Sequence, residues 1–97
     1  MIRNAYLKKV EETLHKLDKE IDSLGKKVET ASAGAKEDLS RQIDALRDKS
    51  EVARERIRGV REAGAETWGR LKRQTEDAVD DVRKDLEKAI QKLRKTG

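Results

Sequence analysis

The sequence predicts an all-α protein, an antiparallel coiled coil or helical hairpin in which a first helix folds back on a long second helix. Three observations lead to this fold class. Apolar residues recur at alternating steps of three and four positions in the first half, and in an 11-residue repeat in the second half. Charged residues make up 45% of the chain and apolar residues only 34%, and there is no proline. Such a composition favours long helices that share a narrow apolar seam. We therefore expect residues 1–97 to form a single coiled-coil domain.

The first predicted helix covers residues 4–30. Its apolar residues follow a heptad over three repeats, and they are Leu7, Val10, Leu14, Leu17, Ile21, Leu24 and Val28. A heptad predicts left-handed coiled-coil packing, because both apolar positions of each repeat then face the same partner helix. Outward positions carry acid-before-base pairs four residues apart, such as Glu12 with Lys16, which support the helix further.

A turn is predicted at residues 31–35. Gly34 weakens a helix here, Thr30 and Ser32 are suitable N-cap residues, and two acidic residues suit the first turn of a following helix. This turn would fold the second helix back on the first. The alternative is one uninterrupted helix, since two alanines keep the seam roughly in phase through the same stretch.

The second predicted helix runs from residue 36 to residue 95. Its first part keeps the heptad spacing, with a seam formed by Leu39, Ile43, Leu46, Ile57 and Val60. Steps of three, four and four residues then continue the seam through Trp68, Leu71, Val79, Val82, Leu86, Ile90 and Leu93. Eleven residues over three turns is about 3.67 residues per turn, so this stripe runs nearly straight along a helix.

Gly59, Gly64 and Gly69 punctuate the second half, and each costs up to about 1 kcal/mol relative to alanine inside a helix. A second turn near residues 62–65 would give three segments of similar length, as in a three-helix bundle. The seam nevertheless passes through Gly64 in phase, which a turn does not require. A long second helix, bent or broken near residues 59–65, is therefore the preferred interpretation, and the three-helix bundle is the alternative.

No pattern in the sequence predicts a catalytic residue, a cofactor or a metal site. Glu12 and His15 form half of the Glu-x-x-His pattern of helical di-iron proteins, but His15 is the only histidine and both residues lie outside the seam. There is no cysteine and no glycine-rich phosphate loop. The composition also leaves too little core for a pocket that excludes water, so we expect a non-enzymatic protein.

The charge pattern bears on the choice of partner. Net charge is +4, but Arg54, Arg56, Arg58 and Arg61 are interleaved with glutamates, which favours a salt-bridged surface over nucleic-acid binding. A membrane surface is a stronger rival, because an amphipathic helix with Trp68 on its apolar side suits a lipid interface. The preferred partner is a second copy, with a dimer favoured, or another coiled-coil protein. No signal-peptide core or bilayer-spanning run is present, so a cytoplasmic location is expected.

Residues 64–72 (GAETWGRLK) and 80–89 (DDVRKDLEKA), with a weaker echo at 42–47 (QIDALR), resemble a family of small bacterial coiled-coil proteins described as stress-response proteins. The resemblance covers the C-terminal part of the chain. Family members often carry further aromatic residues in the seam, where this chain has Val79 and no phenylalanine. The resemblance implies a helical protein linked to stress conditions, as a scaffold or protectant without catalytic residues.

Overall fold

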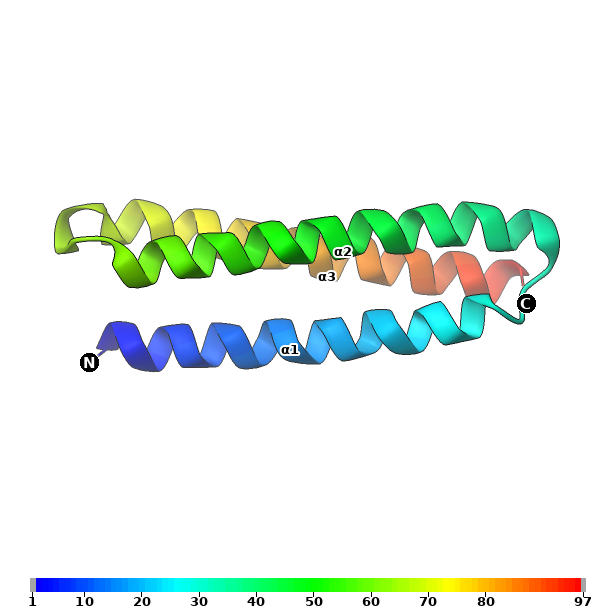
Figure 1. The fold of residues 1–97 in the computed structure, drawn as a ribbon, viewed down its shortest axis with the longest axis horizontal. Coiled ribbons are helices and arrows are strands. Elements are labelled where there is room, and N and C mark those ends of the chain that lie inside the picture. Colours follow the sequence, from blue (N-terminus) through cyan, green and yellow to red (C-terminus); the bar gives the residue numbers. More distant parts are fainter. Residues whose placement is uncertain (1, 97) are drawn as a thin grey trace.

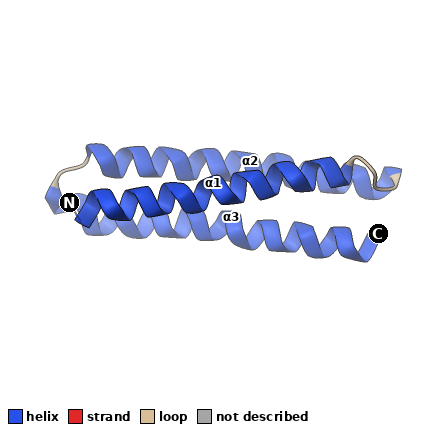
Figure 2. Ribbon diagram, turned by 90° about the horizontal axis from the view of Figure 1, so that it is seen from below, coloured by secondary structure: helices blue, strands red, loops and turns tan. Residues whose placement is uncertain are grey.

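The computed structural model describes residues 2–96, and every regular element in them is helical (Figure 1). Helix α1 spans Ile2–Val28, α2 spans Ala33–Glu62 and α3 spans Trp68–Thr96, with a short 3-10 helix, η1, at Ala65–Thr67. Consecutive helices run in opposite directions, so α1 and α3 point the same way. In Figure 2, α1 crosses in front of the other two helices, so the three do not lie in one layer. The molecule is a three-helix bundle, a rod with Cα extents of 50 × 17 × 16 Å.

The first turn occupies residues 29–32, slightly earlier than the predicted 31–35, because α1 ends at Val28. Thr30 ends the helix by donating hydrogen bonds to a backbone carbonyl that has no partner within the last helical turn. Both its hydroxyl and its backbone N–H donate to the carbonyl oxygen of Lys27, at 2.7 and 3.1 Å. The turn therefore begins where a threonine can satisfy the end of α1.

Ser32 occupies the N-cap position of α2 with an extended backbone, and its carbonyl accepts the N–H of Lys36 at 2.7 Å. Gly34, which suggested the break, instead lies within the first turn of α2, and its backbone does not adopt the left-handed conformation. The side chain of Ser32 makes no capping hydrogen bond, and the second helix begins at residue 33 and not at residue 36, with the glycine inside its first turn.

The long second helix predicted for residues 36–95 is wrong, because the chain turns back at residues 63–67 as in the three-helix alternative. Ala63 leaves α2 with an extended backbone. The N–H and the hydroxyl of Thr67 both donate to the carbonyl of Gly64, at 3.3 and 3.2 Å, which closes η1. A continuous helix would leave its apolar seam in water, whereas this turn lets α2 and α3 bury their seams against each other.

The predicted seam forms the interior of this bundle. Most of its side chains are buried: Leu7, Leu14, Leu17, Ile21, Leu24, Val28, Leu39, Ile43, Leu46, Ile57, Val60, Val82 and Leu86. The others are half-buried: Val10, Trp68, Leu71, Val79, Ile90 and Leu93. The apolar seams of the three helices therefore bury one another within a single chain. The half-buried residues of the seam belong to α3, apart from Val10 of α1.

Candidate interaction surface

Acidic residues of α1 pair with arginines of α2 along the seam between these two helices. Three such pairs follow one another along the bundle: Arg61 with Glu11, Arg54 with Asp18, and Arg47 with Asp22. The arginines recur every seven residues, so they occupy equivalent positions beside the heptad seam. Charges at such flanking positions set partner choice and orientation in helical pairs. We call these three ion pairs the ladder. The ladder favours an antiparallel arrangement of α1 and α2 in a single register.

The third pair departs from the seven-residue step. Counting seven residues onward from Asp18 leads to Gly25, where a Cβ atom would lie 3.5 Å from Nη2 of Arg47. With no charge at Gly25, Arg47 reaches Asp22 at 3.5 Å, and both side chains are largely exposed. Because exposed ion pairs contribute little to stability, the register depends mainly on Asp18, which is the least exposed of the three acids and also accepts from Ser50.

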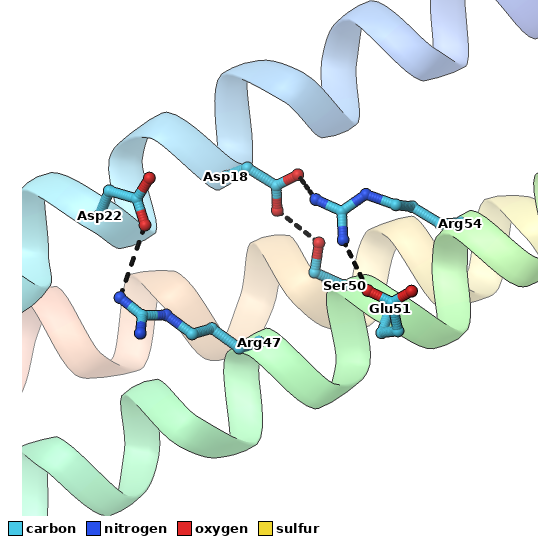
Figure 3. Close-up of polar contacts among 6 residues, drawn as sticks. All are labelled: Asp18, Asp22, Arg47, Ser50, Glu51 and Arg54. Atoms are coloured by element: carbon cyan, nitrogen blue, oxygen red, sulfur yellow. Dashed lines mark hydrogen bonds and ion pairs between the residues drawn. The ribbon is translucent and has the colours of Figure 1, made fainter.

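Ser50 places a polar group inside the seam between α1 and α2. Its side chain is 1% exposed, and its hydroxyl donates to Asp18, whose carboxylate also accepts from Arg54 (Figure 3). Arg54 contacts Glu51 of its own helix as well, at 3.0 Å. A buried hydroxyl needs a hydrogen-bond partner, so sliding α1 along α2 would cost the free energy of leaving Ser50 unpaired.

The seam between α2 and α3 is closed most tightly of the three. Ala53 and Ala89 are completely buried, and such small side chains allow helix backbones to approach closely. Two ion pairs bridge this seam: Lys49 with Asp85, and Lys92 with Asp38 at 3.6 Å. The hydrogen bond to Asp85 raises the pKa of Lys49 and so favours its charged form.

One aromatic cluster joins α1 to α3 at the end of the bundle that carries η1. Tyr6 packs edge-to-face on Trp68, with ring centroids 5.5 Å apart. The Nζ of Lys72 lies 5.0 Å from the Tyr6 ring centre, and the Tyr6 hydroxyl donates to Glu76 at 2.8 Å. Burial, followed by the contact with Glu76, raises the pKa of the Tyr6 phenol. This cluster holds the start of α1 against the start of α3.

Beyond the aromatic cluster, the seam between α1 and α3 remains partly open. A pocket of about 150 Å³ lies between the two helices, with an apolar floor of Val10, Leu17 and Val79. A second pocket, of about 400 Å³, lies nearer the end of α3 over Leu24, Ile90 and Leu93. We call the surface formed by these two pockets the α1/α3 groove.

The α1/α3 groove lies between the two helices that contact each other least. Helices α1 and α3 make fewer contacts with each other than either makes with α2. The ion pairs among the described side chains that link two helices all involve α2, and none joins α1 to α3. The half-buried residues of the predicted seam gather mainly here, so this side is the candidate interaction surface.

The other candidates from the sequence lie on the outside of the bundle. Glu12 and His15 are both exposed on α1, and no cluster of three or more side chains suited to a metal ion occurs within residues 2–96. Within the arginine run, Arg54 and Arg61 bind acids of α1, whereas Arg58 is exposed beside His15 at the rim of a pocket between α1 and α2. This arrangement separates the arginines instead of presenting them as one basic patch.

Sequence reasoning missed the ladder, although its signal was present. The seven-residue spacing of Arg47, Arg54 and Arg61 matches that of Glu11 and Asp18 in the first helix, and this pattern predicts a charged interface between the two. The arginines were considered only as possible phosphate-binding residues, so their spacing was not compared with that of the acids in the first helix. The openness of the α1/α3 groove has no comparable signal, because it depends on how three helices share one seam.

Comparison of the chain with protein-family models, with curated proteins and with solved structures finds no match. No helix within residues 2–96 contains a segment both long enough and apolar enough to cross a bilayer.

Proposed function

We propose that the protein is a non-enzymatic, self-associating helical bundle in which two copies meet through the α1/α3 groove. The observation that carries this proposal is the row of apolar side chains that the bundle leaves half-buried: Val10, Leu71, Val79, Ile90 and Leu93. A second copy laid along the groove would remove this surface from water, a gain of about 25 cal/mol per Å² of apolar area. A dimer is favoured because the groove lies along one side of the rod.

The size and composition of this side support the proposal. The rod is 50 Å long by its Cα extent, so a groove that follows α1 and α3 offers a second copy a long surface of contact. Apolar residues form the floor of the groove, while charged side chains form its rims. An apolar centre surrounded by a polar rim is the usual anatomy of a protein interface. Both partners would be folded in advance, which lowers the ordering cost of association.

The same proposal includes coiled-coil packing of the helices within each copy. The heptad of α1 and the seven-residue ladder of Arg54 and Arg61 against Asp18 and Glu11 support this packing. The resemblance of residues 64–72 and 80–89 to stress-response proteins suggests a stress-related scaffold or protectant in the cytoplasm as the setting. These assignments belong to the proposal.

Replacing Leu93 with lysine tests the groove directly. The new charge would be buried on association, so we expect the dimer dissociation constant to rise at least about tenfold, equivalent to about 1.4 kcal/mol. Val52→Lys is the matched control, because Val52 is an apolar residue of α2 that is already 46% exposed and lies outside the groove. Sedimentation equilibrium measures both constants, with circular dichroism to check that each variant is folded.

A monomeric parent protein at every concentration would contradict the proposed function. A larger effect from Val52→Lys than from Leu93→Lys would instead place the interface on another side of the bundle. Only a selective loss of association in Leu93→Lys supports the groove.

A second candidate function is binding to a lipid surface through α3. The specific observation is that α3 is the most amphipathic helix and carries half-buried Trp68 at its start. Opening at residues 63–67 would free its apolar stripe for an interface. Trp68 is the only tryptophan, so vesicles of phosphatidylserine and phosphatidylcholine should shift its fluorescence to the blue. Unchanged Trp68 emission would exclude this candidate.

A further inference from the structure

Charged side chains line the α1/α3 groove in a definite order along its length. The smaller pocket carries Glu76, Asp80 and Arg83 on its α3 rim. The larger pocket carries Glu20 on α1, together with three cations: Lys19, Lys27 and Arg94. The groove is therefore acidic at the end near the aromatic cluster and basic at the end near the C-terminus. In each pocket, the one charge of opposite sign, Arg83 or Glu20, lies toward the middle.

This order is self-complementary when the groove is reversed. Because α1 and α3 run in the same direction, higher residue numbers on either helix lie closer to the basic end. Turning a second copy end for end places its Arg94, on α3, near Glu76 and Asp80 on α3 of the first copy, and its Lys27 at the same end of the groove on the α1 side. Lys19 lies near the centre, beside the Glu20 residues.

A second copy in the same direction does not fit this order. Its basic end would lie on the basic end of the first copy, so that Lys27 and Arg94 of both copies would meet. Like charges placed together across an interface cost free energy and suppress that arrangement. The charges of the rim thus discriminate between the two directions, whereas the apolar floor fits both.

Most of these charges are available for a partner. Lys19, Glu20, Lys27 and Arg94 form no ion pair among the described residues, and Glu76 accepts only the Tyr6 hydroxyl. Asp80 pairs with Arg83 and Lys84 of its own helix. Such exposed pairs within a helix contribute little, so they can rearrange when a second copy binds.

We propose that the α1/α3 groove binds the same groove of a second copy turned end for end, about a two-fold axis perpendicular to the helices. This inference rests on the proposed self-association and adds the direction and the facing elements. Helix α1 then faces α1 of the second copy, and α3 faces α3. The interface is isologous, as a two-fold dimer requires, and it closes the assembly at two copies.

Disulfide cross-linking tests this arrangement, because the chain contains no cysteine of its own. Thr13 lines the smaller pocket and Ser23 the larger one, and both are exposed on α1. They lie on opposite sides of the centre of the groove, so the proposed rotation brings Thr13 of one copy near Ser23 of the other. The variants Thr13→Cys and Ser23→Cys are therefore prepared separately, and each is checked for folding and for parent-like association.

Mild oxidation of the mixed variants should give the Thr13→Cys to Ser23→Cys dimer as the main product, while either variant alone should cross-link poorly. A sample that sediments as a dimer yet cross-links no better when mixed than alone would overturn the end-for-end arrangement and leave self-association standing. A parent protein that remains monomeric would overturn both proposals. Loss of the cross-link in high salt would further support the charge pairing, since screening weakens such contacts.

Discussion

At the scale of single residues, Asp18 of α1 contacts two residues of α2 at once. Its carboxylate accepts from the buried hydroxyl of Ser50 and from Arg54, so it links the inside of the bundle to the charged ladder. An unpaired buried hydroxyl costs about 1–3 kcal/mol, whereas removal of both partners is nearly neutral. The stability of this site should therefore depend on the pair and not on either residue alone.

We expect Asp18→Ala to lower the free energy of unfolding by about 1–3 kcal/mol, because Ser50 loses its acceptor. Adding Ser50→Ala should recover part of that loss, since no unsatisfied hydroxyl remains. Urea denaturation of both single variants and the double variant gives the interaction energy as a double-mutant cycle. Strictly additive losses would show that the two side chains do not act together.

Tyr6 provides a spectroscopic reporter of the contact between α1 and α3. Burial, followed by the hydrogen bond and negative charge of Glu76, raises the pKa of its phenol above the usual value of about 10. The folded chain therefore holds this proton more tightly than the unfolded chain does. The resulting stabilisation is complete below about pH 10 and is lost as the pH rises through the folded-state pKa.

Tyr6 is the only tyrosine, so the ultraviolet absorbance of tyrosinate follows this single group. We expect the native protein to titrate at a higher pH than the same protein denatured in guanidinium chloride. Glu76→Gln should lower the native midpoint, because it removes the negative charge beside the phenol. Identical midpoints for native and denatured protein would refute the contact.

At the scale of elements, the ladder between α1 and α2 determines how these helices meet. Arg61→Glu places a like charge beside Glu11, and an exposed pair of this kind is worth about 0.2–1 kcal/mol. We expect a decrease of a few degrees in the melting temperature, which follows from about 4–8 °C per kcal/mol in a domain of this size. Adding Glu11→Arg should restore the parent value.

Arg58→Glu is the matched control for this prediction. Arg58 is exposed beside the same pocket but forms no ion pair among the described residues, so its reversal should change the melting temperature little. Thermal denaturation followed at low and high salt measures all four proteins. If Arg58→Glu destabilises as much as Arg61→Glu, net charge and not the ladder accounts for the effect.

The same scale explains which elements could be predicted from the sequence. Apolar spacing predicted an all-helical chain, and Ser32 was recognised as a possible N-cap of the second helix. The turn at residues 63–67 was only the alternative, because Gly64 keeps the apolar repeat in phase and periodicity cannot distinguish a continuous helix from a turn. Gly59 and Gly69 lie inside α2 and α3, so glycine alone was a poor guide to the break.

At the scale of the whole molecule, three amphipathic helices close most of their apolar surface within one chain. The sequence predicted which residues form the seam, since that depends on local spacing. It could not predict that Val79, Ile90 and Leu93 would remain half-buried. The burial of these side chains depends on how closely α1 packs against α2 and against α3, which local spacing does not determine. The ion pairs of α1 among the described residues are all with α2, and the α1/α3 groove lies on the side that has none.

The central claim is that this core closes within one chain and that association follows folding. Far-UV circular dichroism over roughly a hundredfold range of protein concentration tests it most directly, because folding that requires association depends on concentration. The account predicts high helicity that stays constant from the lowest to the highest concentration. Helicity that rises with concentration would contradict it, since the seams would then need a second chain to be buried.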